Sequence, residues 1–526
     1  MTDQKEVAGF DGVSGDPPKD PSPNINSGPP KRPKRNKYAL AISILASMTS
    51  VLLGYDSGVM SGAPIYIKKD LKISDVQIEL LVGTLNIYSL IGSAVAGRTS
   101  DIMGRRKTII LASAIFFVGA ILMGFATNYA FLMVGRFVEG IGVGYALMIA
   151  PVYAAEVAPA SCRGFLTSFP EVFINLGVLL GYVSNYAFSR LPLKLGWRLM
   201  LGIGAVPCIF LAIGVLAMPE SPRWLVLQGR LGDAKKVLDR TSDSLEEAQL
   251  RLADIKAAAG IPEDCNDDVV SVTKRSRGEG VWKELLLHPT PAVKHILIAG
   301  IGIHFFQQAS GIDSVVMYSP RIYEKAGITN DSHKLLATIA VGVSKTLCIL
   351  VATFLVDKHG RRVLLLISAG GLTVSMLLLA TGLTVIDHFD DRHMMSVVAI
   401  CIAMTLSSVG FFSIGMGPIA WVYSSEIFPL RLRAQGCSMG VAVNRFTSGV
   451  LLMTFISLYK AITIGGAFYL FTGIAATGWV FFYTLLPETQ GRTLEEMEGL
   501  FGTFFKWRST MRELKKKKQL EGTDDA

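Results

Sequence analysis

Apolar windows about twenty residues long recur along this chain, and each is long enough to cross roughly 30 Å of hydrocarbon as a helix. Of the 526 residues, 50% are hydrophobic and 18% are charged. An ordinary soluble domain is charged at about 25% of its positions, so the composition favours a membrane protein. The predicted fold class is an all-α membrane protein with twelve transmembrane helices, which begin near Tyr38, Gln77, Thr108, Ala130, Leu166, Trp197, Ala292, Leu335, Val363, Met395, Ala434 and Gly466.

The basic residues are distributed among the short connections between these spans. The net charge of +9 does not indicate a nucleic-acid partner, because no single soluble face collects these residues. Lysine and arginine in short loops set membrane topology instead. We expect the runs at 97–107, 357–362 and 506–518 to face the cytoplasm, with both termini inside. The first apolar run is too long for a signal peptide and has no small-residue cleavage site after it, so we expect it to be retained.

A polar stretch separates two sets of six spans. Within it, residues 229–241 and 244–260 place apolar side chains three and four apart, which predicts short amphipathic helices. Its charges are mixed in sign, which favours a solvated helical linker over a catalytic domain. The predicted division is a disordered basic tail, a six-helix half, the linker, a second six-helix half and a cytoplasmic tail, at 1–37, 38–218, 219–291, 292–486 and 487–526.

Three motifs occur in the same order in both sets of spans. The pattern D-x-x-G-R-R follows the second span in "SDIMGRR" and the eighth in "VDKHGRR". The fourth span is followed by "PVYAAEVAPASCRG" and the tenth by "VYSSEIFPLRLRAQG". The sixth is followed by "PESPRW" and the twelfth by "PETQGRT". Matched motifs in matched order indicate an internal duplication of six spans.

The stretch "LLGYDSGVMSG" at 52–62 carries Asp56 inside an apolar run. A carboxylate at this depth costs several kcal/mol unless it is paired or neutralised, so we interpret it as functional. The candidate partner is Arg136 on the fourth span. Because the proton affinity of a carboxylate depends on its distance from a guanidinium, movement between the two helices would be coupled to proton binding. The alternatives are a static Asp56–Arg136 salt bridge and a static pairing of Arg136 with Glu139, one turn further on.

Together with "QQASGID" at 307–313 and "GPIAW" at 417–421, these motifs resemble the sugar porter family of the major facilitator superfamily. The resemblance runs from about 38 to 498. Residues 169–188 and 307–327 are most similar to the plant polyol and monosaccharide transporters. The resemblance implies two pseudo-symmetric six-helix halves that expose a central site to each side of the membrane in turn.

The adjacent amides of Gln307 and Gln308 each offer a donor and an acceptor, which suits the vicinal hydroxyls of a polyol. Hydrogen bonding between helices is the alternative use of glutamine in a membrane. The resemblance implies that the substrate is bound by Glu171, Gln307, Gln308, Asp313, Lys345, Trp421 and Asn444.

Asp313 and Lys345 stand where many relatives carry asparagine. Either charge alone would be costly in the membrane, so we hypothesise that the two form an ion pair near the site. The alternative is that Lys345 snorkels away while Asp313 bonds locally.

The duplicated loops also carry matched acidic and basic residues. The resemblance implies a cytoplasmic gate, an ion-pair network that latches the halves together while the site faces outward. Exposed ion pairs contribute only about 0–1 kcal/mol each, but a two-state transporter needs a bias of only a few kcal/mol. The expected gate residues are Asp101, Arg105, Arg106, Glu156, Arg163, Glu220, Arg223, Asp357, Arg361, Arg362, Glu426 and Arg433.

These observations predict a proton-coupled symporter that imports polyols and monosaccharides by alternating access. A facilitator with Asp56 permanently salt-bridged is the first alternative, and a non-transporting sugar sensor is the second. The sequence has no HExxH, G-x-S-x-G or P-loop motif, so we expect no enzyme activity, and we expect no cofactor and no metal site. The expected partners are a small polyol or monosaccharide, protons and the lipid bilayer, for a monomer in the plasma membrane.

Overall fold

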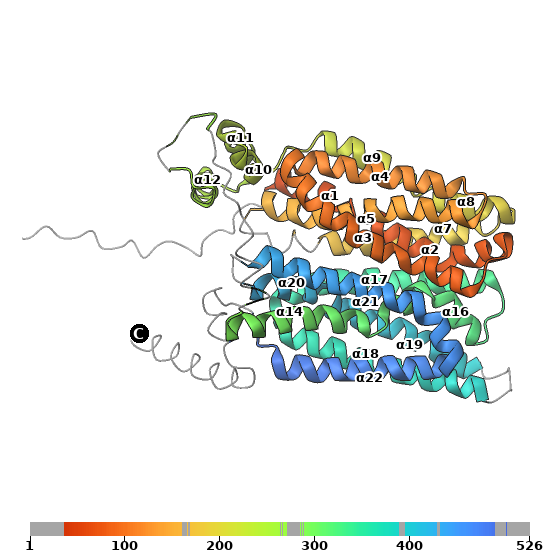
Figure 1. Cartoon of the computed structure of the whole chain (residues 1–526). Helices are drawn as coiled ribbons and strands as arrows, with labels where there is room; N and C mark the ends of the chain where they lie inside the picture. Colours follow the sequence, from red (N-terminus) through yellow and green to blue (C-terminus); the bar gives the residue numbers. More distant parts are fainter. Residues whose placement is uncertain are drawn as a thin grey trace, which may run out of the picture. The chain divides into compact units, whose positions relative to one another are not determined.

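The computed structural model describes residues 36–159, 166, 169–262, 265, 267–270, 285, 287, 289–388, 395–428, 432–489 and 501. Long helices joined by short connections make up most of these residues (Figure 1). The fold is thus all-helical in the described part of the chain, as the apolar windows predict.

Capping residues begin several helices of the first half. Asn36 accepts hydrogen bonds from the backbone N–H groups of Tyr38 and Ala39, which starts the first helix. Ser74 and Gln77 form a capping box before the third. The bounds are α1 (Lys37–Ser47), α2 (Ser50–Leu71), α3 (Asp75–Met103), α4 (Arg105–Gly124), α5 (Tyr129–Val157), α7 (Phe169–Phe188), α8 (Leu193–Gly202) and α9 (Ala205–Leu216).

Three short helices follow the first half: α10 (Pro222–Leu227), α11 (Leu231–Thr241) and α12 (Leu245–Ala259). The last two confirm the amphipathic helices predicted in the linker. The side chain of Asn36 donates to the backbone oxygens of Arg240 and Ser242 at 2.7 and 2.8 Å. The start of α1 is therefore tied to the end of α11.

The second half repeats the pattern, with two of its spans broken. The seventh span breaks at Gly311, whose φ of 80° is a left-handed conformation that favours glycine. The tenth breaks at Gly415, between α19 and α20. The bounds are α14 (Pro291–Ala309), α15 (Ile312–Met317), α16 (Ser319–Lys325), α17 (Asp331–His359), α18 (Arg361–His388), α19 (Met395–Ile414), α20 (Met416–Ile427), α21 (Arg433–Ile462) and α22 (Ile464–Leu485).

Ten helical segments among the described residues are long and apolar enough to cross a membrane. They coincide with ten of the twelve predicted spans. The fifth and seventh predicted spans correspond to α7 and to α14–α16, which fall outside that set. A Cβ at Gly54 or Gly58 of α2 would lie 1.9 or 2.3 Å from a backbone oxygen of α7, so these two helices are in close contact. The structure thus contains all twelve predicted helical spans.

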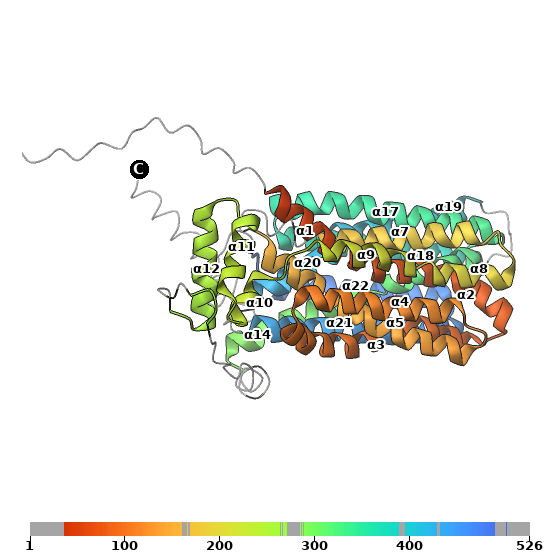
Figure 2. The same cartoon turned by 90° about the horizontal axis from the view of Figure 1, so that it is seen from above.

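The two halves meet along two helix pairs, α3 with α21 and α7 with α17 (Figure 2). The helix α10 packs against the end of the bundle where α4 begins, because Trp224 donates to the backbone oxygen of Asp101 at 3.0 Å. We call this end the linker end and the opposite end the far end.

Candidate functional site

A buried ion cluster lies between α2 and α5. The guanidinium of Arg136 is 0% exposed, and its Nη1 donates to Asp56 Oδ1 and, at 3.2 Å, to Glu139 Oε2. Its Nε donates to the backbone oxygen of Leu81 at 2.9 Å. The structure brings together Asp56 and the partner predicted for it, and it also gives Arg136 the second carboxylate that the sequence offered as an alternative.

This cluster is only partly satisfied. Within the described part of the chain, Asp56 Oδ2 and Arg136 Nη2 are buried without a hydrogen-bond partner. Two carboxylates share one guanidinium, so the three groups have a net charge of −1 when both acids are ionised. The two carboxylates thus compete for one cation in a desolvated site.

An amide cluster joins α14 to α21. Asn444 donates to Gln307 Oε1 at 2.7 Å, and Gln308 donates to Asn444 Oδ1 at 3.3 Å. Gln307 also donates to the backbone oxygens of Met416 and Gly417, both at 2.9 Å. These carbonyl groups lie at the start of α20, where the tenth span is broken. Three residues predicted to bind substrate are thus in direct contact.

Trp421 lies beside this cluster, with its ring edge-on to that of His304 at 5.1 Å between centroids. His304 is 0% exposed, and its Nε2 lies 3.2 Å from the hydroxyl of Ser424. A Cβ at Gly440 would lie 2.4 Å from the His304 ring, so α21 leaves room for the imidazole only because it has glycine there. The imidazole thus holds one side of the Trp421 ring.

The hypothesised ion pair between Asp313 and Lys345 is not formed. Ser448 donates to Asp313 instead, and among the described residues Lys345 makes no hydrogen bond or ion pair within 4.0 Å. Glu171, on α7 of the first half, interacts electrostatically with both. The partner of Asp313 is thus a hydroxyl of α21, 135 positions away in the sequence.

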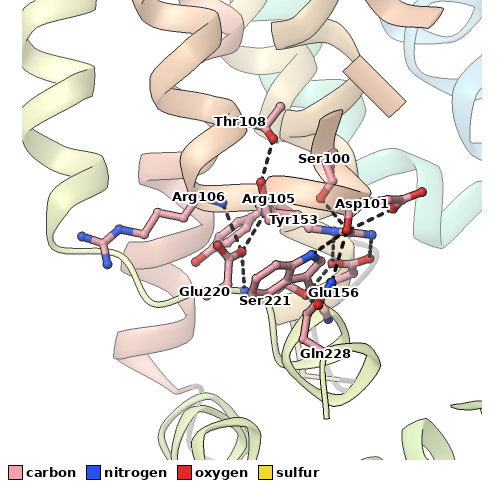
Figure 3. Close-up of polar contacts among 12 residues, drawn as sticks. Ser100, Asp101, Arg105, Arg106, Thr108, Tyr153, Glu156, Glu220, Ser221 and Gln228 are labelled. Atoms are coloured by element: carbon pink, nitrogen blue, oxygen red, sulfur yellow. Dashed lines mark hydrogen bonds and ion pairs between the residues drawn. The ribbon is translucent and has the colours of Figure 1, made fainter. Parts of the chain in front are cut away.

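The linker end of the first half holds a compact polar network (Figure 3). Arg105 donates from Nε and Nη2 to the two carboxylate oxygens of Glu156, at 3.0 and 3.1 Å. Glu220 accepts from the backbone N–H groups of Arg105 and Arg106 at 2.8 and 3.1 Å, so it caps the N-terminus of α4. Ser221 donates to Glu156 at 2.5 Å and closes the network.

Gly104 is the glycine of the first D-x-x-G-R-R motif, and its surroundings show why glycine is needed there. Its φ is 94°, and a Cβ there would lie 2.4 Å from Glu220 Oε2. The glycine therefore lets the carboxylate reach the first turn of α4. Asp101, the acid of the motif, lies 3.2 Å from Arg105 Nη1 but is 75% exposed.

The second half repeats these contacts. Arg361 donates to Glu426 Oε1 at 3.3 and 3.1 Å. Glu488 accepts from the backbone N–H groups of Arg361 and Arg362 at 2.9 and 3.0 Å, as Glu220 does in the first half. Thr489 donates to Glu426 at 2.6 Å. The duplicated motifs thus form duplicated networks.

The structure describes the predicted cytoplasmic gate in part. The side-chain contacts of Glu156 and Glu426 stay within their own halves, to Arg105 and Ser221 and to Arg361 and Thr489. Arg223 is exposed. Three further gate residues are outside what the structure describes: Arg163, and the side chains of Asp357 and Arg433. Among the described residues, these two glutamates thus bond within each half.

Among the described residues, the ion pairs that join the halves lie at the far end. Asp75 on α3 pairs with Lys460 on α21, and with Arg321 on α16 at 3.3 Å. Glu79 is 1% exposed, and its carboxylate accepts from the backbone N–H and the hydroxyl of Ser457, both at 2.7 Å. These far-end contacts are absent from the sequence predictions. Asp75 lies in the first turn of α3, where an acid is ordinary, so the sequence gives no signal of its contact with the second half.

One further ion pair crosses between the halves at the same end. Lys69, in the last turn of α2, lies 2.6 Å from Asp331, in the first turn of α17. Both side chains are partly exposed, so this pair adds little stability by itself.

Comparison with known proteins agrees with this architecture. Residues 42–501 match the family model described as "Sugar (and other) transporter". Polyol transporter 5 of Arabidopsis thaliana is 70% identical over 483 residues, which cover 92% of this chain and 89% of that protein. The glucose transporter GlcP of Staphylococcus epidermidis is 33% identical over 467 residues, which cover 88% of this chain and 97% of that protein.

Solved structures give the same result. The proton:xylose symporter XylE, bound to 6-bromo-6-deoxy-D-glucose, matches with a TM-score of 0.73 at 26% identity, over 89% of this chain and 100% of that chain. A partially occluded inward open conformation of XylE from E. coli matches with a TM-score of 0.72 at 26% identity, over 87% of this chain and 100% of that chain. Fold and site thus define a multi-pass membrane transporter of the major facilitator superfamily. The chain belongs to the sugar transporter family, which confirms the predicted family and twelve-helix fold. Its relatives are transporters rather than enzymes.

Proposed function

We propose that this chain is a symporter that imports a polyol or monosaccharide together with a proton by alternating access. The observation that carries the proposal is the buried Asp56–Arg136–Glu139 cluster, inside a chain of the sugar transporter family. A relative named polyol transporter and a structural neighbour described as a proton:xylose symporter support the substrate class and the coupling.

The proton site is Asp56. A carboxylate that loses its guanidinium partner in a desolvated site binds a proton more readily. Arg136 is on α5 and Asp56 on α2, so a shift between these helices changes their separation. Proton binding and helix movement thereby become linked, which is the requirement for coupling.

The substrate site is the amide cluster of Gln307, Gln308 and Asn444, with Trp421 beside it. Amides donate to and accept from hydroxyl groups, and the indole offers a flat apolar face to a carbon skeleton. Gln308 Oε1 is buried and has no partner within the described residues, so it is available to a substrate hydroxyl. Asp313, Lys345 and Glu171 complete the site, and Glu171 is the member contributed by the first half.

The conformation faces the linker end. Asp75 and Glu79 join the halves at the far end, while Glu156 and Glu426 bond within their own halves. The basic residues of the linker end place it in the cytoplasm by the positive-inside rule. We therefore assign an inward-facing state, with both termini cytoplasmic, to a monomer of the plasma membrane. The tails, halves and linker keep the limits 1–37, 38–218, 219–291, 292–486 and 487–526.

Uptake of labelled sorbitol, xylitol, inositol and glucose into transporter-deficient yeast, with and without a protonophore, tests the proposal. We expect the wild-type chain to concentrate a polyol and the protonophore to abolish accumulation. Asp56→Asn keeps the size of the side chain but removes the proton, so accumulation is lost while downhill flux remains. Glu139→Gln removes the other acid beside Arg136, and accumulation that survives in this variant assigns the proton to Asp56. An Asp56→Asn variant that still concentrates substrate contradicts the assignment.

The second candidate is a facilitator. The contact between Glu139 and Arg136 at 3.2 Å favours it, because this glutamate lies on the same helix and remains beside the arginine in every state. A facilitator brings the internal polyol concentration to the external one, and a protonophore leaves this internal concentration unchanged. The same uptake assay therefore separates the two candidates.

A further inference from the structure

Arg445 follows Asn444 on α21, and its guanidinium is held by a single long contact. Nη1 donates to Asn86 Oδ1 at 3.4 Å. Nε is buried and has no hydrogen-bond partner within the described residues. A guanidinium has five N–H donors, so most of them are open. No ion pair within 4.0 Å joins Arg445 to an acid among the described residues.

Three other charged side chains lie within electrostatic range of Arg445. Arg445 interacts electrostatically with Asp313 of α15 and Glu171 of α7, and Lys345 of α17 interacts with all three. The two acids and two bases come from four helices of both halves, and their charges cancel. All four side chains are partly exposed, so none is sealed inside the protein.

A chain of hydrogen bonds orients part of this group. Arg445 contacts Asn86, whose Nδ2 donates to Ser448 at 3.2 Å, and Ser448 in turn donates to Asp313. Asn86 lies on α3 of the first half, so the chain crosses from one half to the other. Its members fix the acid and the base but leave most of their hydrogen-bonding capacity unused.

Unpaired charges in a membrane protein require another partner, because burying them alone costs several kcal/mol. A polyol supplies one, since each hydroxyl both donates and accepts. The planar fork of arginine suits two adjacent oxygen atoms. Residues next to each other on a helix point in different directions, so Asn444 enters the amide cluster while Arg445 enters the charged group. An extended substrate is able to touch both.

We propose that Arg445 is a further substrate-binding residue, which donates to two adjacent hydroxyls of an open-chain polyol while Asp313 and Glu171 accept from others. The proposal rests on the proposed transport function and specifies its substrate class. A ring sugar is more compact, so it occupies the amide cluster and depends less on Arg445. The charged group then determines selectivity for open-chain polyols.

The test compares Arg445→Gln and Arg445→Lys with the wild-type full-length chain. Arg445→Gln removes the charge and the fork, whereas Arg445→Lys keeps the charge alone. The matched control is Arg190→Gln, which changes an exposed arginine that stacks on Tyr186 at 5.2 Å. Binding of sorbitol, of each monodeoxy sorbitol and of glucose is measured by calorimetry on purified protein, alongside uptake.

We expect Arg445→Gln to weaken sorbitol binding about tenfold, glucose binding less than about threefold, and Arg445→Lys to be intermediate. A monodeoxy sorbitol that lacks a hydroxyl bound by Arg445 should bind the wild-type chain about tenfold more weakly than sorbitol does. In Arg445→Gln the two compounds should bind with equal affinity. If removing each hydroxyl lowers the affinity equally in the wild-type chain and in Arg445→Gln, the proposal is wrong. If the melting curve shows that Arg445→Gln does not fold, the affinities of Arg445→Lys for sorbitol and the monodeoxy sorbitols test the proposal instead. A wild-type chain that binds no polyol refutes the proposed function itself, whereas polyol binding without any dependence on Arg445 refutes only this inference.

Discussion

Replacing Asp75 with asparagine should release the far end of the transporter. Asp75 joins α3 of the first half to Lys460 and Arg321 of the second. Its third partner, Lys68, belongs to the first half, so that contact does not join the halves. Asparagine also weakens the interaction of Asp75 with the dipole of its own helix, but that loss is the same in every conformation.

The magnitude follows from the exposure of the two contacts that join the halves. Lys460 is 54% exposed, so its pair contributes less than about 1 kcal/mol. Arg321 is 17% exposed and Asp75 19%, so their pair contributes somewhat more. The loss is about 1–2 kcal/mol, which shifts the ratio of far-end-open to far-end-closed molecules by about 5- to 30-fold.

Spin labels at Leu80→Cys on α3 and Lys325→Cys on α16 measure this ratio by pulsed electron spin resonance, after the native cysteines are replaced by serine. The Asp75→Asn variant should increase a population with a longer distance between labels. The matched control is Lys68→Gln, which removes a partner of Asp75 but no contact between the halves. A ratio that changes less than twofold, or that changes equally in Lys68→Gln, refutes the reasoning.

Three other substitutions test the sites described above. Gln307→Ala removes hydrogen bonds worth about 0.5–1.5 kcal/mol each, so the apparent KM for sorbitol should rise about 2- to 13-fold, and an unchanged KM places the substrate elsewhere. Glu220→Ala leaves three backbone N–H groups without their acceptor, and we expect a loss of about 1.5–3 kcal/mol, measured as a lower melting temperature in detergent. Gly104→Ala combines a strained φ with a 2.4 Å approach to Glu220, whereas Gly260→Ala has a φ of 75° and nothing within 4 Å. Gly104→Ala should therefore lower the melting temperature more than Gly260→Ala. Equal effects argue against the close approach of a Cβ at position 104 to Glu220.

Helix positions could be predicted because they depend on local signals. The first span was expected near Tyr38 and begins at Lys37, and the twelfth was expected near Gly466 and begins at Ile464. Apolar length and capping residues such as Asn36 are properties of neighbouring positions, so a sequence displays them directly. The duplicated motifs likewise predicted an internal duplication, and the equivalent residues of the two halves make equivalent contacts.

Contact partners could not be predicted in the same way. Glu156 pairs with Arg105, which is 51 positions away. Asp313 bonds to Ser448, 135 positions away, rather than to the lysine hypothesised as its partner. Partner choice among charged groups depends on which helices pack together. Matched spacing in a sequence shows which residues are equivalent, but it does not show which residues touch.

Coupling of proton and substrate movement is the central claim, and proton flux tests it most directly. Purified chain is reconstituted into liposomes that contain a pH-sensitive dye, and sorbitol is added outside without an imposed pH gradient. If one proton enters with each sorbitol molecule, the interior acidifies as sorbitol enters, and Asp56→Asn abolishes the acidification while sorbitol still crosses. Sorbitol entry through the wild-type chain with no change in internal pH contradicts the account.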